Sequence, residues 1–208
     1  MKTQRTHYQL IVDRSGSMSD CIDATIDGFN EQLNRIRHME MEFPEQDIRI
    51  GLTLFNDMVN QIRLGDPVRD MPQMNRKNYI PASTTALLDA IGKTLQLLEE
   101  REVSRNDLPI TYVVVILTDG YENSSECFNL AQVRTMIQRL EGTGRWTFSF
   151  IGATLDAVDV AKQMAIKEQN SFAFNKASMK EEVWDKLSGS MHSYFDKKKS
   201  GTDTSNLF

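Results

Sequence analysis

The chain has 208 residues, of which 40% are hydrophobic and 25% are charged, and its formal net charge is −5. These values are typical of one soluble globular domain, and the acidic balance argues against a nucleic-acid partner, which would require a basic surface. No apolar run approaches the roughly 20 residues of a membrane span. Because no apolar signal region precedes the first strand, we expect a cytoplasmic protein in which Cys21 and Cys127 are free thiols.

Short apolar strands alternate with amphipathic helices along the chain. Ile22, Ile26, Phe29 and Leu33, for example, recur at the spacing of one helix face. In chain order we predict a strand at 8–12, a helix at 22–36, a hairpin of strands at 48–55 and 58–64, a polar loop at 65–82, a helix at 87–98, a strand at 110–117, a helix at 130–140, a strand at 146–151, a helix at 156–166, a strand at 171–174 and a helix at 180–195.

This alternation predicts an α/β fold with a doubly wound, Rossmann-like sheet. We expect six strands in the order 3-2-1-4-5-6, mainly parallel, with one antiparallel edge strand from the hairpin and helices on both faces. No linker or repeat divides the chain, so we predict one domain over residues 1–196. Residues 197–208 lack a core-forming pattern and are predicted to be a polar, disordered tail.

A run of oxygen-bearing side chains follows the first strand. Asp13, Ser15 and Ser17 alternate along the chain as it leaves that strand. One carboxylate and two hydroxyls directed to one point are suitable ligands for a hard divalent cation. The same run could be an ordinary turn, because Asp and Ser also favour turns.

Two more loops carry side chains of the same kind. Asp119 follows the most apolar strand, and Thr85 lies in a hydroxyl-rich stretch that leads into a helix. In the expected strand order, Asp13 and Asp119 end neighbouring strands at the point where the order reverses, which is where such sheets bind ligands. Thr85 can add a third hydroxyl, although Ser83, Thr84 and Thr85 could also serve to cap the helix.

These residues resemble the metal-ion-dependent adhesion site of the von Willebrand factor A domain. The family pattern of Asp-x-Ser-x-Ser, a distant Thr and a distant Asp-Gly is met by 13–17, Thr85 and Asp119-Gly120. The resemblance extends over about 6–195, and the stretch 117–125 is similar to intracellular bacterial or phage members, many of which act in multi-protein assemblies.

The resemblance implies a role for each residue. Ser15 and Ser17 would bind the metal directly, Thr85 would do so in the ligand-bound state, and Asp13 and Asp119 would often act through water. Thr84 is the alternative to Thr85. In the family the final helix can shift when the site binds its ligand, so a similar shift here is a hypothesis, although Trp184 and Phe195 are most simply packing residues.

The charge count predicts an open site. Two aspartates neutralise a divalent ion, and neutral hydroxyls leave Mg²⁺ electrophilic, with water positions that a partner's carboxylate could take. Mn²⁺ and Ca²⁺ are alternatives to Mg²⁺. We therefore expect a non-enzymatic module that captures an Asp or Glu of a protein partner through the metal ion.

Two other functions fit the same residues. The first is a metal-dependent hydrolase or phosphoryl-transfer enzyme, but neither His nor Lys lies in the three loops to act as a base. The second is a scaffold with a vestigial metal site. His7, His38 and His192 have no metal-ligand spacing and are interpreted as structural, and Glu122, Asn123 and Ser124 are interpreted as a solvated loop.

Overall fold

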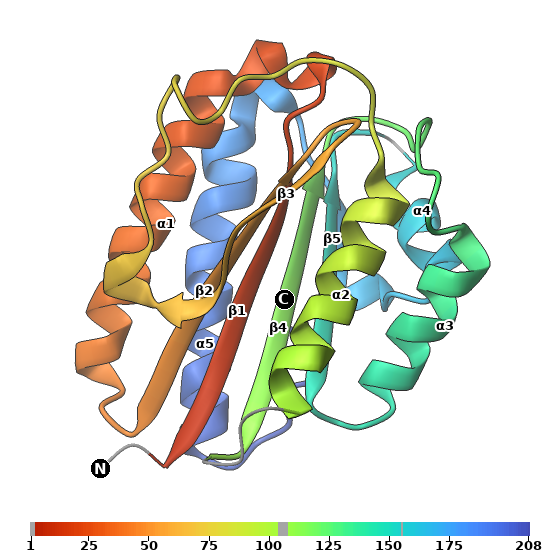
Figure 1. The fold of residues 1–208 in the computed structure, drawn as a ribbon. Coiled ribbons are helices and arrows are strands. Elements are labelled where there is room, and N and C mark those ends of the chain that lie inside the picture. The colour runs from red at the N-terminus through yellow and green to blue at the C-terminus, as the bar shows by residue number, and fades with distance from the viewer. Residues whose placement is uncertain (1–2, 104–107, 155) are drawn as a thin grey trace.

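The computed structural model describes residues 3–103, 108–154 and 156–208, and Figure 1 shows them as one twisted sheet between two layers of helices. The strands are β1 (Gln4–Asp13), β2 (Gln46–Phe55), β3 (Val59–Pro67), β4 (Ile110–Thr118), β5 (Trp146–Gly152) and β6 (Ser171–Ala173). The helices are α1 (Ile22–Glu42), α2 (Leu87–Val103), α3 (Leu130–Glu141), α4 (Ala157–Gln163) and α5 (Lys186–Lys199).

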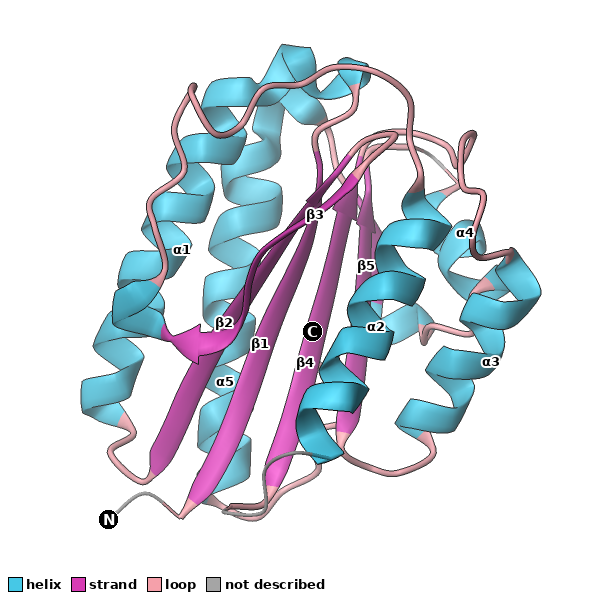
Figure 2. Cartoon of the chain, in the orientation of Figure 1, coloured by secondary structure: helices cyan, strands magenta, loops and turns pink. Residues whose placement is uncertain are grey.

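The order of the strands confirms the predicted fold class. The six-stranded sheet runs β3-β2-β1-β4-β5-β6, and Figure 2 shows the strands side by side. All neighbouring strands are parallel except β3, which pairs with β2 in the antiparallel direction. The order reverses between β1 and β4, so the loops that follow these two strands open the crevice in which doubly wound sheets bind ligands.

Each face of the sheet buries its own hydrophobic core, because successive side chains of a strand point to opposite faces. In β1, Tyr8, Leu10 and Val12 pack on the side of α1 and α5, whereas Ile11 packs on the side of α2, α3 and α4. β4 is apolar on both faces over 113–117, as expected of a central strand that helices cover on both sides, whereas β1 carries the buried polar residues His7 and Gln9 on the same face as Ile11. This burial fixes the register of β1 against β4, in which Val12 is paired with Leu117. The two strands therefore end side by side.

The last helical stretch differs from the single helix that we predicted over 180–195. It begins as a π-helical segment, Lys180–Asp185, and continues as α5. Trp184 in this segment is 1% exposed and lies directly on α1, where a Cβ atom added at Gly28 would come 2.0 Å from its ring. Gly28 therefore lets α1 and the last helical stretch approach closely.

The C-terminal residues also differ from expectation, which was a disordered tail at 197–208. Residues 197–199 form the last turn of α5, and Leu207 is buried while its N–H donates to Asn170 Oδ1 at 2.7 Å. The ring of Phe208 packs edge-on against Phe172 of β6. Packing of the apolar residues Leu207 and Phe208 explains why the polar stretch before them is ordered.

Candidate metal site

The five side chains predicted to hold a metal ion lie together at the edge of the sheet formed by the carboxyl ends of the parallel strands. Three separate loops supply them. Asp13 ends β1, Ser15 and Ser17 follow it in the loop before α1, Thr85 lies two residues before α2, and Asp119 follows β4. The structure therefore joins residues that are up to 106 positions apart in sequence.

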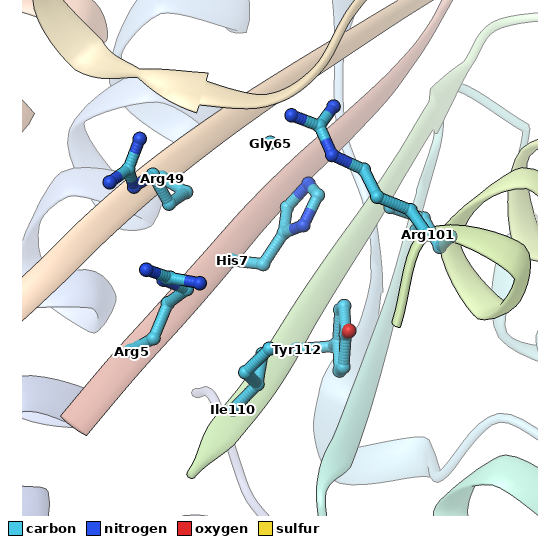
Figure 3. Close-up of a pocket in the computed structure, with 8 residues that line it drawn as sticks. Arg5, His7, Arg49, Gly65, Arg101, Ile110 and Tyr112 are labelled. Carbon is cyan, nitrogen blue, oxygen red and sulfur yellow. The ribbon is translucent and has the colours of Figure 1, made fainter. Parts of the chain in front are cut away.

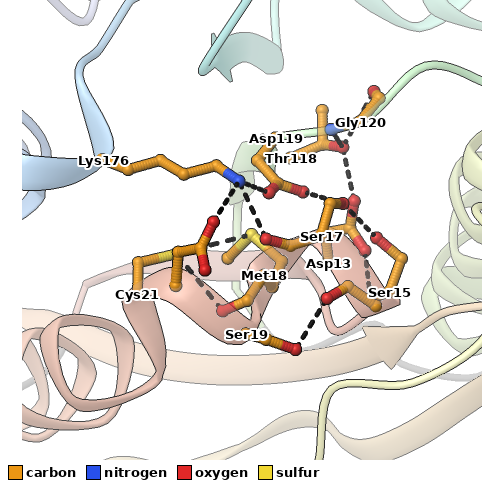
Figure 4. A network of polar contacts seen from close by, with 12 residues as sticks. Asp13, Ser15, Ser17, Met18, Ser19, Cys21, Thr118, Asp119, Gly120 and Lys176 are labelled. Carbon is orange, nitrogen blue, oxygen red and sulfur yellow. Dashed lines mark hydrogen bonds and ion pairs between the residues drawn. The ribbon is translucent and has the colours of Figure 1, made fainter.

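Hydrogen bonds connect the first and third loops, as Figure 4 shows. The backbone N–H of Ser15 donates to Asp13 Oδ1 at 2.6 Å, and the hydroxyls of Ser15 and Ser17 lie 3.1 Å apart. The Ser17 hydroxyl then donates to Asp119 Oδ1 at 2.7 Å. The two carboxylates are thus held on either side of a pair of hydroxyls.

Gly120 provides the space at the centre of the group. A Cβ atom added there would lie 3.1 Å from Thr85 Oγ1, 3.5 Å from Ser17 Oγ and 3.8 Å from Asp13 Oδ2. Oxygens from all three loops therefore surround a point that a Cβ atom at position 120 would crowd. This cradle suits a small ion or a water molecule bound to one.

Asp13 is fully buried, and burial raises the pKa of its carboxyl to about 6. Hydrogen bonds from Thr118 and Ser15 oppose this rise, the first of them from Thr118 Oγ1 to Asp13 Oδ2 at 2.6 Å. A bound cation would favour the carboxylate and release the proton. Sequence reasoning missed Thr118, although its place beside Asp119 at the end of β4 puts it at the same edge.

Asn123 fixes the position of Thr85. Its side-chain oxygen accepts the Thr85 N–H at 2.8 Å, and its own N–H donates to the Thr85 carbonyl at 3.1 Å. Thr85 is buried against this loop, whereas Thr84 is exposed. The geometry therefore favours Thr85 over Thr84 as the third hydroxyl of the site.

The loop after β4 also binds the start of α2. Glu122 accepts the N–H of Leu88 at 2.9 Å, and the Ser125 hydroxyl accepts the N–H of Asp89 at 2.9 Å. We had expected one of the hydroxyls at 83–85 to cap this helix, and had interpreted Glu122 and Asn123 as a solvated loop. Instead, the loop that carries Asp119 also holds Thr85 and the helix that follows it.

A lysine reaches the site from a fourth loop. Lys176 lies after β6, and its ammonium pairs with Asp119 and donates to the backbone carbonyl of Ser17 at 2.8 Å. Burial lowers the pKa of Lys176, but the hydrogen bond to Asp119 and the neighbouring negative charges together raise that pKa above the ordinary value. The side chain is therefore positively charged. The three loops themselves contain no Lys, and sequence reasoning missed Lys176 because it lies far along the chain from them.

The donor set fits a hard divalent cation. Two carboxylates and three hydroxyls offer only oxygen, which suits Mg²⁺, Mn²⁺ or Ca²⁺. The part of the chain that the structure describes contains no cluster of three His, Cys, Asp or Glu side chains that could hold an ion instead. Any ion at this edge would therefore depend on Ser15, Ser17 and Thr85.

Together the fold and this edge define a doubly wound α/β domain with a group of converging oxygen donors at its topological switch point. The family model of the von Willebrand factor type A domain matches residues 9–188. The chain belongs to this family. A search of curated proteins finds no match to the sequence.

Solved structures share the fold at low sequence identity. The manganese-loaded TRAP protein of Plasmodium vivax is 18% identical with a TM-score of 0.58, and the match covers 87% of this chain and 72% of that one. The PilB minor pilin of Streptococcus sanguinis is 10% identical with a TM-score of 0.63, over 92% of this chain and 62% of that one.

A mussel byssus protein, proximal thread matrix protein 1, was solved with a zinc-occupied MIDAS motif. It is 12% identical with a TM-score of 0.59, and the match covers 88% of this chain but 48% of the mussel chain. This chain thus spans about half of that protein's length. Likenesses at these identities establish the fold that the proteins share.

Proposed function

We propose that this domain is a non-enzymatic protein-binding module whose Mg²⁺ or Mn²⁺ ion captures an Asp or Glu of a partner. Ca²⁺ is the alternative ion. Asp13, Ser15, Ser17, Thr85 and Asp119 would hold the ion. The observation that carries the proposal is the convergence of these hard oxygen donors around Gly120. Two of the solved relatives are described with manganese and with zinc, which supports a divalent ion.

The charge of the donor set supports an open site. Two carboxylates neutralise a divalent ion, and the neutral hydroxyls leave it electrophilic. Such an ion gains from a further carboxylate, which a partner can supply in exchange for bound water. The residues of the chain hold and orient the ion, and the partner completes its coordination.

Exposed apolar side chains around the site support a protein as the ligand. Met58, Ile80 and Tyr121 are 64%, 57% and 60% exposed, and each belongs to a loop at the same edge of the sheet. Hydrogen bonds from Asn56 to Met58 and to Ala82 tie the first two of these loops together. A polar centre with apolar surroundings suits a protein interface better than it suits a small polar substrate.

The charge state of Lys176 argues against catalysis at this site. A general base must be able to accept a proton near neutral pH. A lysine amine is ordinarily protonated near neutral pH, and the ion would engage both aspartates. A turnover assay with phosphate and ester substrates, with and without Mg²⁺, tests the competing hydrolase function. We expect no turnover.

The proposal is tested by affinity capture from the native host, in Mg²⁺ and again in excess chelator. We expect partners that bind the wild-type protein only in Mg²⁺ and do not bind the Asp13→Ala variant. Asp70→Ala is the matched control, because Asp70 is an exposed carboxylate between β3 and α2. Partners that bind Asp13→Ala as they bind the wild type would contradict the proposal, provided that circular dichroism shows an intact fold.

We also propose that the domain acts in the cytoplasm, within a multi-protein assembly. Cys21 and Cys127 are free, and Cys127 is exposed, which suits a reducing compartment. Among the described residues, none of the helices combines the length and the apolar character needed to cross a bilayer. Cell fractionation of the native host, with blotting for the protein, tests this location.

A further inference from the structure

The contacts of Lys176 single it out among the residues of the site. Its ammonium contacts the Asp119 carboxylate and the Ser17 carbonyl (Figure 4). It also lies 3.9 Å from the exposed carboxylate of Asp20. The Lys176 side chain is 29% exposed, and the side chain of Asp119 is fully buried. Water therefore screens this ion pair less than it screens a surface pair.

The backbone around Lys176 is well anchored. The side chain of the preceding residue, Asn175, accepts the N–H of Ala177 at 3.0 Å, and Glu182 accepts the N–H of Asn175 at 2.7 Å. These bonds join the loop after β6 to the π-helical segment that follows it. The ammonium is thus presented to the site by a fixed turn.

The position of Lys176 changes the net charge of the site when a divalent ion is bound. Asp13 and Asp119 contribute −2 and Lys176 contributes +1, so a divalent ion would bring the buried group to a net +1. Without Lys176 the same group would be neutral. A positive charge close to the ion lowers the affinity for the ion and raises the affinity for an incoming carboxylate.

We propose that Lys176 is a built-in counter-charge that weakens binding of the metal ion alone and strengthens capture of the partner's carboxylate. This inference rests on the proposed function and concerns the electrostatics of the same site. The ion and the acidic ligand then bind cooperatively, because each offsets the charge that the other leaves unbalanced.

The competing explanation is that Lys176 has only a structural role and holds the loop after β6 against Ser17 and Asp119. In that case its loss would loosen Ser17 and Asp119, and binding of metal and of carboxylate would both weaken. The counter-charge predicts opposite changes, with tighter metal binding and weaker carboxylate binding. The sign of the two effects separates the explanations.

The test uses the full chain as wild type and as Lys176→Met, Lys176→Arg and Lys180→Met. Arginine keeps the charge at position 176. Lys180 is an exposed lysine on the same stretch, paired with Glu31 at 3.0 Å, and serves as the matched control. Calorimetric titration with MnCl₂ measures the affinity for the metal alone. Acetate is then titrated at saturating Mn²⁺ while water-proton relaxation is recorded. The change in relaxation measures displacement of metal-bound water by a carboxylate.

We expect Lys176→Met to bind Mn²⁺ about tenfold more tightly and acetate several-fold more weakly than the wild type. Lys176→Arg and Lys180→Met should stay close to the wild type. Mn²⁺ affinity that is unchanged or lower in a folded Lys176→Met variant overturns the counter-charge but leaves the metal site intact. If neither the wild type nor Lys176→Met binds Mn²⁺, the proposed function and this inference both fall.

Discussion

The two edges of the same sheet bury charge in opposite ways. At the carboxyl-end edge, the loops after β1 and β4 bring two buried carboxylates together with hydroxyls and Lys176. At the amino-end edge, the partly buried Lys198 of α5 donates from its ammonium to the hydroxyls of Thr6 and Thr111, at 2.7 and 2.8 Å. Burial alone lowers the pKa of Lys198 to about 8, and this lysine forms no ion pair with any described residue.

The remaining charges at the amino-end edge are paired within the fold. Figure 3 shows Arg5, Arg49 and Arg101 around a pocket of about 20 Å³, which has room for about one water molecule. Asp47 binds the first two arginines, and Asp66 binds the third. A Cβ added at Gly65 would meet the ring of His7 at 2.5 Å, so the pocket closes tightly on that side.

The difference shows why one edge is a candidate site and the other is not. At the amino-end edge the three arginines pair with Asp47 or Asp66, and Lys198 is solvated by hydroxyls. At the carboxyl-end edge Asp13 and Asp119 face one lysine, which leaves a negative charge that a cation could balance. We therefore expect a metal ion to bind at the carboxyl-end edge only, and the following predictions test this, from the largest expected effect to the smallest.

Replacing one carboxylate should remove the response to metal. At a concentration of one hundred times the Kd, Mn²⁺ should raise the free energy of unfolding of the wild type by about 2.7 kcal/mol. Asp119→Asn should lose this stabilisation, while Lys198→Met should retain it in full. Denaturant unfolding with Mn²⁺ and with chelator measures both. A loss in Lys198→Met would mean that the two edges are coupled.

Lys198 should make the protein more stable as the pH rises from 8 to 9.5. Its folded pKa of about 8 lies below the ordinary value of 10.5, so over this range the unfolded chain binds a proton that the folded chain does not. The wild type should gain about 1.5 kcal/mol relative to Lys198→Met. Urea unfolding of both proteins at the two pH values tests this, and parallel pH profiles would rule it out.

Filling the cradle should weaken metal binding. Gly120→Ala places a methyl group 3.1 Å from Thr85 Oγ1, and we expect Mn²⁺ affinity to fall about tenfold, or about 1.4 kcal/mol. Gly189→Ala in α5 is the control, because an added Cβ there meets no atom within 4 Å. Calorimetry measures both affinities, and equal affinities would show that the space at Gly120 is not used.

Loosening Thr85 should have the smallest effect. Asn123→Ala leaves the N–H of Thr85 without its acceptor, and we expect Mn²⁺ affinity to fall about fivefold, or about 1 kcal/mol. Asn129→Ala removes the N-cap of α3 instead, so it should lower stability by about 1 kcal/mol without changing Mn²⁺ affinity. Metal titration and thermal unfolding of both variants separate the two roles.

Much of the fold and the candidate site could be predicted because local patterns encode them. Uninterrupted apolar strands such as 110–117 identify the centre of the sheet, and the strand order then brings Asp13 and Asp119 together. The residues that orient the site could not be predicted in the same way. Lys176 and Asn123 act through contacts between loops, and nothing in their own sequence neighbourhood distinguishes them from surface residues.

The backbone conformation of Ser83 could not be predicted from the sequence either. Ser83 has a φ of +68°, a conformation that favours glycine, and its carbonyl accepts the N–H of Gly16 at 3.0 Å. This bond ties the Thr85 loop to the loop of Ser15 and Ser17. Such strain is tolerated only because the surrounding contacts impose it, so sequence patterns do not reveal it.

The two tryptophans give the molecule one natural fluorophore on each side of its sheet. Trp146 is stacked on Tyr112 at a centroid distance of 3.9 Å, on the side of α2 and α3. Trp184 lies against Gly28 on the opposite side, eight residues after Lys176. In a variant that keeps only Trp184, the emission would report on the helix layer next to the loop of Ser15 and Ser17, and a second variant that keeps only Trp146 would report on the opposite layer as a reference.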